Sequence, residues 1–203
     1  QKRVESVKFI QDNIAIDILS SETQFDLLKE VSCQNVSDSM LSPELSILGD
    51  KLSHTENERG EKDEDVIYLK KYYSLLQVKD YLLSKKLAEK CGALKKPVFI
   101  IYFYSNKGDC DDCTKEGYVL TRLKEKYPEL RVYSFDYDLD LSVIDSLKAI
   151  FRIKAAPLPA LVIEDKTYTG FKSVEELEAL LPDTLKEATV ATSTTATTSK
   201  KSK

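Results

Sequence analysis

The chain reads PVFIIYFYSNKGDCDDC at residues 97–113, and this stretch decides the fold. Val98 to Tyr104 form a continuous apolar and aromatic run, which is typical of a strand buried on both faces of a sheet. A polar loop at 105–109 leads from this run to Cys110 and Cys113, whose spacing lets two sulfurs meet across one helical turn. The stretch therefore predicts a thiol pair at the junction between a buried strand and a helix.

Helices and strands alternate after the cysteines. Strands linked through helices are expected to pair in parallel by right-handed crossovers, whereas two strands joined by a tight reversal at 164–166 must be antiparallel. The sequence thus predicts an α/β domain with a four-stranded mixed sheet flanked by helices. Ser142 is the expected cap of the second helix, and Ser173 with Glu176 forms a capping box before the last. The expected elements are a helix from 110 or 111 to 127, a strand at 131–136, a helix at 142–151, strands at 160–163 and 167–170, and a helix to 181.

Residues 1–92 show helical periodicity and predict a helical hairpin or small bundle. Ser42-Pro43 suits the start of its second helix, and the charge-dense stretch 56–65 reads as a solvated turn. Leucines and a tyrosine recur at spacings of three, four or seven over 69–87, and Gly92 marks the end of that third helix. We expect these apolar faces to form a core; the alternative is an arm for oligomerisation or for a partner.

Composition limits the possible partners. The net charge of −4, without a basic patch interleaved with aromatics, argues against nucleic acid. No stretch reaches the roughly 18 apolar residues that a membrane span requires. The chain begins with Gln1 and not with Met, so we expect a fragment or a processed protein with a signal peptide or membrane anchor upstream. The expected organisation is a helical region at 1–92, an α/β domain at 93–186 and a disordered Thr/Ser/Lys tail at 187–203.

Two further cysteines, Cys33 and Cys91, each lie near the end of a predicted helix. If the Cys-x-x-Cys pair is internal, they can form a disulfide between helices; the alternative is two free, buried thiols. Such a disulfide favours an oxidising compartment, and the glycosylation sequon at 35–37 points the same way. We expect an extracytoplasmic protein, either secreted or membrane-anchored.

Residues 94–185 resemble the thioredoxin superfamily. The resemblance rests on a buried strand entering Cys110-Asp111-Asp112-Cys113, on the helix–strand–helix unit that follows, and on Leu158-Pro159 directly before a strand. It implies a thioredoxin-like fold and thiol–disulfide oxidoreductase activity. It further implies that Cys110 attacks, that Cys113 resolves, that Pro159 is cis and faces the thiols, and that the backbone of Leu158 pairs with an extended substrate. Pro157 competes with Pro159 for the cis position.

The motif departs from the common family pattern. Asp109 stands where many members have Trp, and Asp111-Asp112 replaces their Gly-Pro spacer. The preceding strand has Tyr102, Phe103 and Tyr104 where a buried acid often accepts protons in the family.

Charge around the thiols is mixed. The three acids beside the cysteines oppose a second anion at Cys110, whereas Lys107 and Lys115 favour it. We expect a weakly stabilised thiolate, and we expect these acids, as part of the substrate site, to disfavour acidic substrates.

The sequence favours disulfide exchange with protein substrates and with a redox partner protein, without cofactor or metal. One short cysteine pair and a single histidine, His54, are too few for a metal site. The alternative is a non-catalytic thioredoxin-like module that binds or scaffolds a partner, beside a membrane or elsewhere.

Overall fold

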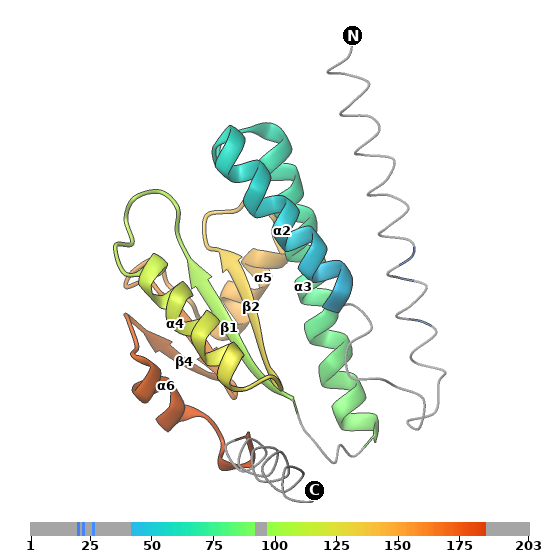
Figure 1. Cartoon of the computed structure of the whole chain (residues 1–203), viewed down its shortest axis with the longest axis vertical. Coiled ribbons are helices and arrows are strands. Elements are labelled where there is room, and N and C mark those ends of the chain that lie inside the picture. The colour runs from blue at the N-terminus through green and yellow to red at the C-terminus, as the bar shows by residue number, and fades with distance from the viewer. Residues whose placement is uncertain (1–19, 21, 23–25, 27–41, 92–96, 186–203) are drawn as a thin grey trace, which may run out of the picture. The chain divides into compact units, whose positions relative to one another are not determined.

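A computed structural model describes Ser20, Glu22, Asp26 and residues 42–91 and 97–185 of the 203-residue chain (Figure 1). The chain divides between Leu94 and Lys95 into two compact units, which are considered separately below. Apart from Ser20, Glu22 and Asp26, residues 1–41 lie outside the described residues, and with them the first predicted helix and Cys33. The predicted tail at 187–203 lies outside them as well. No helix in the described part of the chain is long and apolar enough to cross a membrane.

The first unit contains a helical hairpin made of α2 (Ser42–Arg59) and α3 (Glu64–Cys91). Leu52 of α2 is buried against Val66 and Leu69 of α3. The helices approach closely at Gly49, because a Cβ atom added there would lie 3.3 Å from the Tyr73 hydroxyl oxygen. A larger residue at this position would therefore press against the Tyr73 side chain.

The predicted solvated turn at 56–65 is shorter than expected. Helix α2 continues to Arg59, and Gly60, with φ at 83°, ends it by donating its N–H to Glu56 O at 2.8 Å. Asp63 then accepts the N–H of Asp65 at 2.9 Å in the first turn of α3. Residues 57–59 of this segment are exposed, whereas Glu56 is half-buried and lies 3.0 Å from Lys70 Nζ of α3, so the end of α2 is joined to α3 by an ion pair.

The second unit is built on a four-stranded sheet in the order β2-β1-β3-β4. Strand β1 pairs in parallel with β2, and β3 pairs antiparallel with both β1 and β4. The α/β prediction with a mixed sheet is confirmed. The elements are β1 (Val98–Tyr104), α4 (Cys113–Lys126), β2 (Leu130–Asp136), α5 (Ser142–Phe151), β3 (Ala160–Ile163), β4 (Lys166–Thr169) and α6 (Val174–Leu180).

The direction of β3 differs from the rule that helix-linked strands run in parallel. Ala160, the first residue of β3, pairs with Phe103 near the end of β1, so β3 starts where β1 finishes. Helix α5 has ten residues, and residues 152–159 return the chain to the end of the sheet at which β2 ended. The connection therefore begins and finishes at the same end of the sheet, so β3 runs antiparallel to β1.

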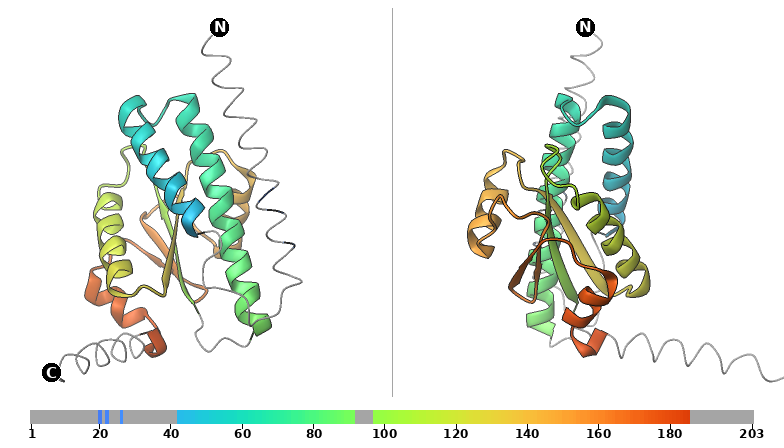
Figure 2. Two further views of the ribbon diagram at one scale, coloured as in Figure 1. Left: turned by 45° about the vertical axis from the view of Figure 1, so that its right-hand side comes forward. Right: turned by 90° about the vertical axis from the view of Figure 1, so that its left-hand side faces the viewer.

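Helices α4 and α6 cover one face of the sheet, and α5 lies on the other (Figure 2). The predicted capping box is confirmed: Ser173 accepts the N–H of Glu176, whose side chain accepts the N–H of Ser173. The predicted cap at Ser142 is wrong by one residue, since Leu141 is the N-cap of α5 and Ser142 is already helical. The core on the α4–α6 side comprises Val98, Ile100, Tyr102, Leu120, Leu123, Tyr127, Leu130, Leu161, Ile163, Leu177, Leu181 and Leu185.

The β3–β4 hairpin turns at two acidic residues in the left-handed region. Glu164 has φ at 47° and Asp165 has φ at 63°. Two-residue hairpin loops with positive φ at both positions match the twist of the flanking strands, and Asn-Gly is their favoured sequence.

Candidate active site

Cys110 and Cys113 form a disulfide, with an S–S distance of 1.97 Å and a Cα–Cα distance of 5.4 Å. Cys110 is partly exposed, whereas Cys113 is buried, with 5% of its surface accessible. The two sulfurs therefore differ in access: the first in the chain is the one that a large molecule can approach.

Helix α4 begins later than expected. Residues 110–112 form a turn, in which Cys113 donates its N–H to Cys110 O at 3.3 Å, and the helix starts at Cys113. The positive end of the helix dipole therefore lies at Cys113, whose sulfur is bonded to that of Cys110. Tyr102 of β1 donates its hydroxyl to Cys113 O at 2.6 Å, which fixes the start of the helix against the sheet.

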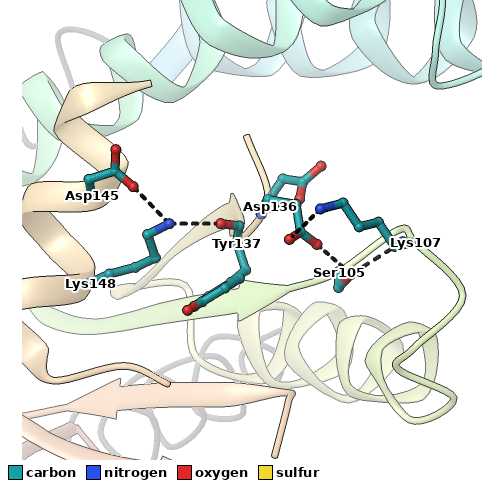
Figure 3. Close-up of polar contacts among 7 residues, drawn as sticks. Ser105, Lys107, Asp136, Tyr137, Asp145 and Lys148 are labelled. Atoms are coloured by element: carbon teal, nitrogen blue, oxygen red, sulfur yellow. Dashed lines mark hydrogen bonds and ion pairs between the residues drawn. The ribbon is translucent and has the colours of Figure 1, made fainter. Parts of the chain in front are cut away.

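The loop between β1 and the cysteines is held by the turn that follows β2 (Figure 3). Asp138 accepts hydrogen bonds of 2.8 Å from Ser105 Oγ and from Lys107 Nζ. Burial alone would raise the pKa of Asp138, but the bonds from Lys107 and Ser105 hold this pKa below its ordinary value. On the same turn, Lys148 of α5 donates to Tyr137 O at 3.0 Å. This network fixes the position from which residues 108–110 leave the sheet.

Both lysines expected to assist the thiolate are engaged by carboxylates. Lys107 lies 2.8 Å from Asp138, and Lys115 lies 2.7 Å from Asp112. These hydrogen bonds raise the pKa of each lysine. Neither positive charge acts alone on Cys110, so the paired acids weaken the support that the sequence suggested.

Pro159 lies at the same end of the sheet as the cysteines. Because Ala160 pairs with Phe103, the residue before it lies beside the end of β1, from which the loop runs to Cys110. The peptide bonds Ala156–Pro157 and Leu158–Pro159 are both cis. Pro159 is buried and accepts the N–H of Gly170 at 2.8 Å, and Leu158 is half-buried.

A buried carboxyl group, Glu116, lies one helical turn after Cys113. Its side chain is fully buried, and Oε2 accepts the backbone N–H of Lys172 at 2.8 Å. Burial raises the pKa of Glu116 to about 6, although the bond from Lys172 acts in the opposite direction. Burial of Tyr102 itself, together with the charge of Glu116, raises the pKa of Tyr102, which therefore remains a hydrogen-bond donor.

The sequence pointed to some of these residues and missed others. It did not single out Glu116 or Asp138, although Glu116 occupies an otherwise apolar stripe whose spacing alternates between three and four residues. That stripe consists of Cys113, Glu116, Leu120, Leu123 and Tyr127. A charged residue at such a position was the available signal.

The other residues predicted for the site are the acids beside the cysteines and the second cysteine pair. Asp109 and Asp111 are exposed beside the cysteines, and Asp112 is half-buried as the N-cap of α4. Cys91 ends α3, and Cys33 lies outside the described residues, so their disulfide stays a prediction. No group of three or more His, Cys, Asp or Glu within the described ranges is arranged to hold a metal ion.

Comparison with known proteins finds two similar solved structures. One is a malarial protein, 24% identical over 41% of this chain and 91% of its own length, with a TM-score of 0.34. The other is thioredoxin-2, described as a component of the malaria parasite protein secretion machinery; it is 24% identical over 43% of this chain and 84% of its own length, with a TM-score of 0.35. No family model and no curated protein matches the chain. By its strand order, its strand directions and the cysteine pair that follows β1, the unit at 97–185 is thioredoxin-like in fold.

Proposed function

We propose that the thioredoxin-like unit exchanges disulfides with protein substrates. The observation that carries the proposal is the disulfide between a partly exposed Cys110 and a buried Cys113 at the carboxyl end of β1. A permanent structural bond gains nothing from one accessible sulfur, whereas an exchanging pair needs both access for attack and shelter for resolution.

In the reducing direction, the Cys110 thiolate attacks one sulfur of a substrate disulfide, and the other substrate sulfur leaves with its electron pair and takes up a proton. Cys113 then attacks Cys110, the bond between Cys110 and the substrate breaks, and the second substrate thiol is released. The protein pair loses two electrons and the substrate disulfide gains them. The reverse sequence oxidises a substrate dithiol.

The surroundings of the pair support a polypeptide substrate. Strand β3 begins beside the end of β1, so the backbone at Leu158 lies at the edge of the sheet to which the cysteines belong. Phe171, which follows β4 at that edge, is partly exposed. An extended segment would find backbone groups and an aromatic side chain next to Cys110.

An insulin-reduction assay with dithiothreitol as electron donor tests the proposal on the full chain. We expect turnover by the wild type and background rates for Cys110→Ser. The Cys113→Ser variant should instead accumulate a mixed disulfide with the substrate, which non-reducing electrophoresis detects. His54→Ala, in the exposed part of α2, is the matched control and should keep full activity.

The opposite outcome would favour a binding or scaffold module. In that case the wild type would not exceed Cys110→Ser, and Cys113→Ser would trap no substrate. We place the activity in an oxidising, extracytoplasmic compartment with a redox partner protein that restores the pair. Pull-down with Cys113→Ser, followed by mass spectrometry of the trapped proteins, tests both assignments, since cytosolic targets alone would contradict them.

A further inference from the structure

Glu116 is an ionisable residue in the apolar interior, one helical turn after Cys113 on α4. Its side chain is 0% exposed, and among the described residues no other glutamate is buried. The groups that face it come from four places: Tyr102 of β1, Lys172 after β4, Glu176 of α6 and Asp112 at the start of α4. An ionised carboxyl in such a place costs free energy that needs a compensating role or partner.

The two oxygens of Glu116 have different surroundings. Oε2 accepts the backbone N–H of Lys172 at 2.8 Å, which ties the segment after β4 to α4. Oε1 is buried and, within the described part of the chain, has no hydrogen-bond partner. A structural tether explains Oε2 only, and an unpaired buried oxygen in a folded protein calls for an explanation.

Glu116 and Cys113 lie on the same buried face of α4. The two residues are three apart on α4, and side chains at this spacing lie on one helix face with Cβ atoms about 5–6 Å apart. Both side chains are buried on that face. The nearby Tyr102 hydroxyl donates to Cys113 O, and the half-buried Asp112 accepts a hydrogen bond from Lys115 through Oδ1.

The geometry points to Glu116 as the group that accepts the proton of the Cys113 thiol when the disulfide forms, and returns it when the disulfide is reduced. This inference rests on the proposed function. In the resolving step, the S–H proton passes to Oε1 of Glu116, directly or through one water. The Cys113 sulfur attacks Cys110, and the substrate sulfur leaves with the electron pair of the broken bond. The carboxyl later releases its proton to solvent or to the departing thiolate.

The ionisation of Glu116 suits this exchange in both directions. Burial raises its pKa to about 6, so near neutral pH it is mainly an acceptor but still holds a proton part of the time. Such a carboxyl group can accept and return the proton of the buried Cys113 thiol, as water does for an exposed thiol.

The test is single-turnover oxidation of the reduced full chain by dithiodipyridine. Attack by Cys110 releases one thiopyridone, and attack by Cys113 on the resulting mixed disulfide releases a second. Glu116→Gln retains the volume and an acceptor for Lys172, whereas it removes the titration and replaces the other oxygen by an NH2 group. We expect the first release to be unchanged and the second to be roughly 100-fold slower near pH 7. The gap should close as hydroxide deprotonates Cys113 at higher pH.

A Cys110→Ser/Cys113→Ser double variant corrects for the other cysteines. Equal second-phase rates in wild type and Glu116→Gln between pH 6 and 8, or equal slowing of both phases, would overturn the inference. Should Glu116→Gln fail to fold, infrared difference spectra of wild type with isotope-labelled glutamate decide: a buried carboxyl band must change between disulfide and dithiol, and an unchanged band contradicts the proposal. The reagent reacts with any accessible thiol pair, so loss of the Glu116 effect is distinguishable from absence of insulin turnover.

Discussion

At the scale of single residues, the site contrasts an exposed acidic rim with one carboxyl group buried beneath it. Asp109 and Asp111 face solvent, where salt screens their charges. Glu116 is shielded from solvent, so its ionisation is coupled to folding. The rim therefore acts on incoming molecules, and the buried acid acts on the protein itself.

Removal of one rim charge should change the preference for substrates. We expect Asp111→Asn to raise the exchange rate with an acidic disulfide peptide relative to a basic one by about 3-fold at low ionic strength, and by less in high salt. Glu125→Gln, at the far end of α4, is the control of equal charge. Peptide oxidation followed by chromatography measures both rates, and an equal change in the two variants would exclude a local effect.

Removal of the buried charge should change the dependence of stability on pH. The pKa of Glu116 is about 6 in the folded protein and near 4.5 when unfolded, so the folded state binds more protons between these values. Wild-type stability therefore falls as pH rises through this window, by up to about 2 kcal/mol. Glu116→Gln lacks this loss, so its free energy of unfolding relative to wild type should rise from pH 4 to pH 7.

Urea unfolding of the oxidised proteins at the two pH values measures this difference. A constant offset between Glu116→Gln and wild type at both pH values would show that Glu116 does not titrate as stated. Glu125→Gln again serves as the exposed control.

At the scale of elements, α4 joins the thiol pair to the sheet and carries a glycine in its interior. Gly117 has ordinary helical backbone, and a Cβ atom added there would meet no heavy atom within 4 Å. Gly117→Ala should stabilise α4 by about 0.5–1 kcal/mol, because alanine loses less backbone entropy in a helix. Slower amide hydrogen exchange along α4 is the expected readout.

Gly49→Ala in α2 is the matched comparison. The same gain in helix propensity is offset there by the contact of 3.3 Å with the Tyr73 hydroxyl, so we expect a smaller gain or a loss in α2. Similar slowing in both helices would mean that propensity alone governs, and that the close approach at Gly49 has no cost.

Elements also show what sequence reasoning can reach. The bounds of β1 followed from an apolar run long enough to be buried on both faces, and the capping box of α6 from a local pattern. The sequence predicts that α4 starts at 110 or 111, because the acids at 111–112 suit a helix start, whereas the backbone first forms a turn and α4 begins at Cys113. The Asp138 network joins residues 31 and 33 positions apart, and pairing at that distance depends on the sheet and not on local sequence.

At the scale of the whole molecule, the helical hairpin and the thioredoxin-like unit are separate compact bodies on one chain. We expect the proposed Cys33–Cys91 disulfide to stabilise the first body by closing a loop of about 60 residues, which contributes about 4 kcal/mol in the chain-entropy account. The short Cys110–Cys113 loop contributes about half of that on the same account.

Non-reducing peptide mapping by mass spectrometry tests the linkage, and unfolding of Cys33→Ser measures its contribution. A mapped Cys33–Cys91 peptide with a large loss of stability in the variant is the expected result. Free thiols at both positions in the isolated protein would contradict it.

The turn between β3 and β4 has a consequence for anyone who wishes to make this protein more robust. Glu164 and Asp165 occupy backbone angles at which a side chain costs about 1–2 kcal/mol per residue. An Asn-Gly pair would suit those angles and would leave the cysteines, the Pro159 segment and Glu116 untouched. The hairpin is therefore a place where heat tolerance can be engineered independently of redox chemistry.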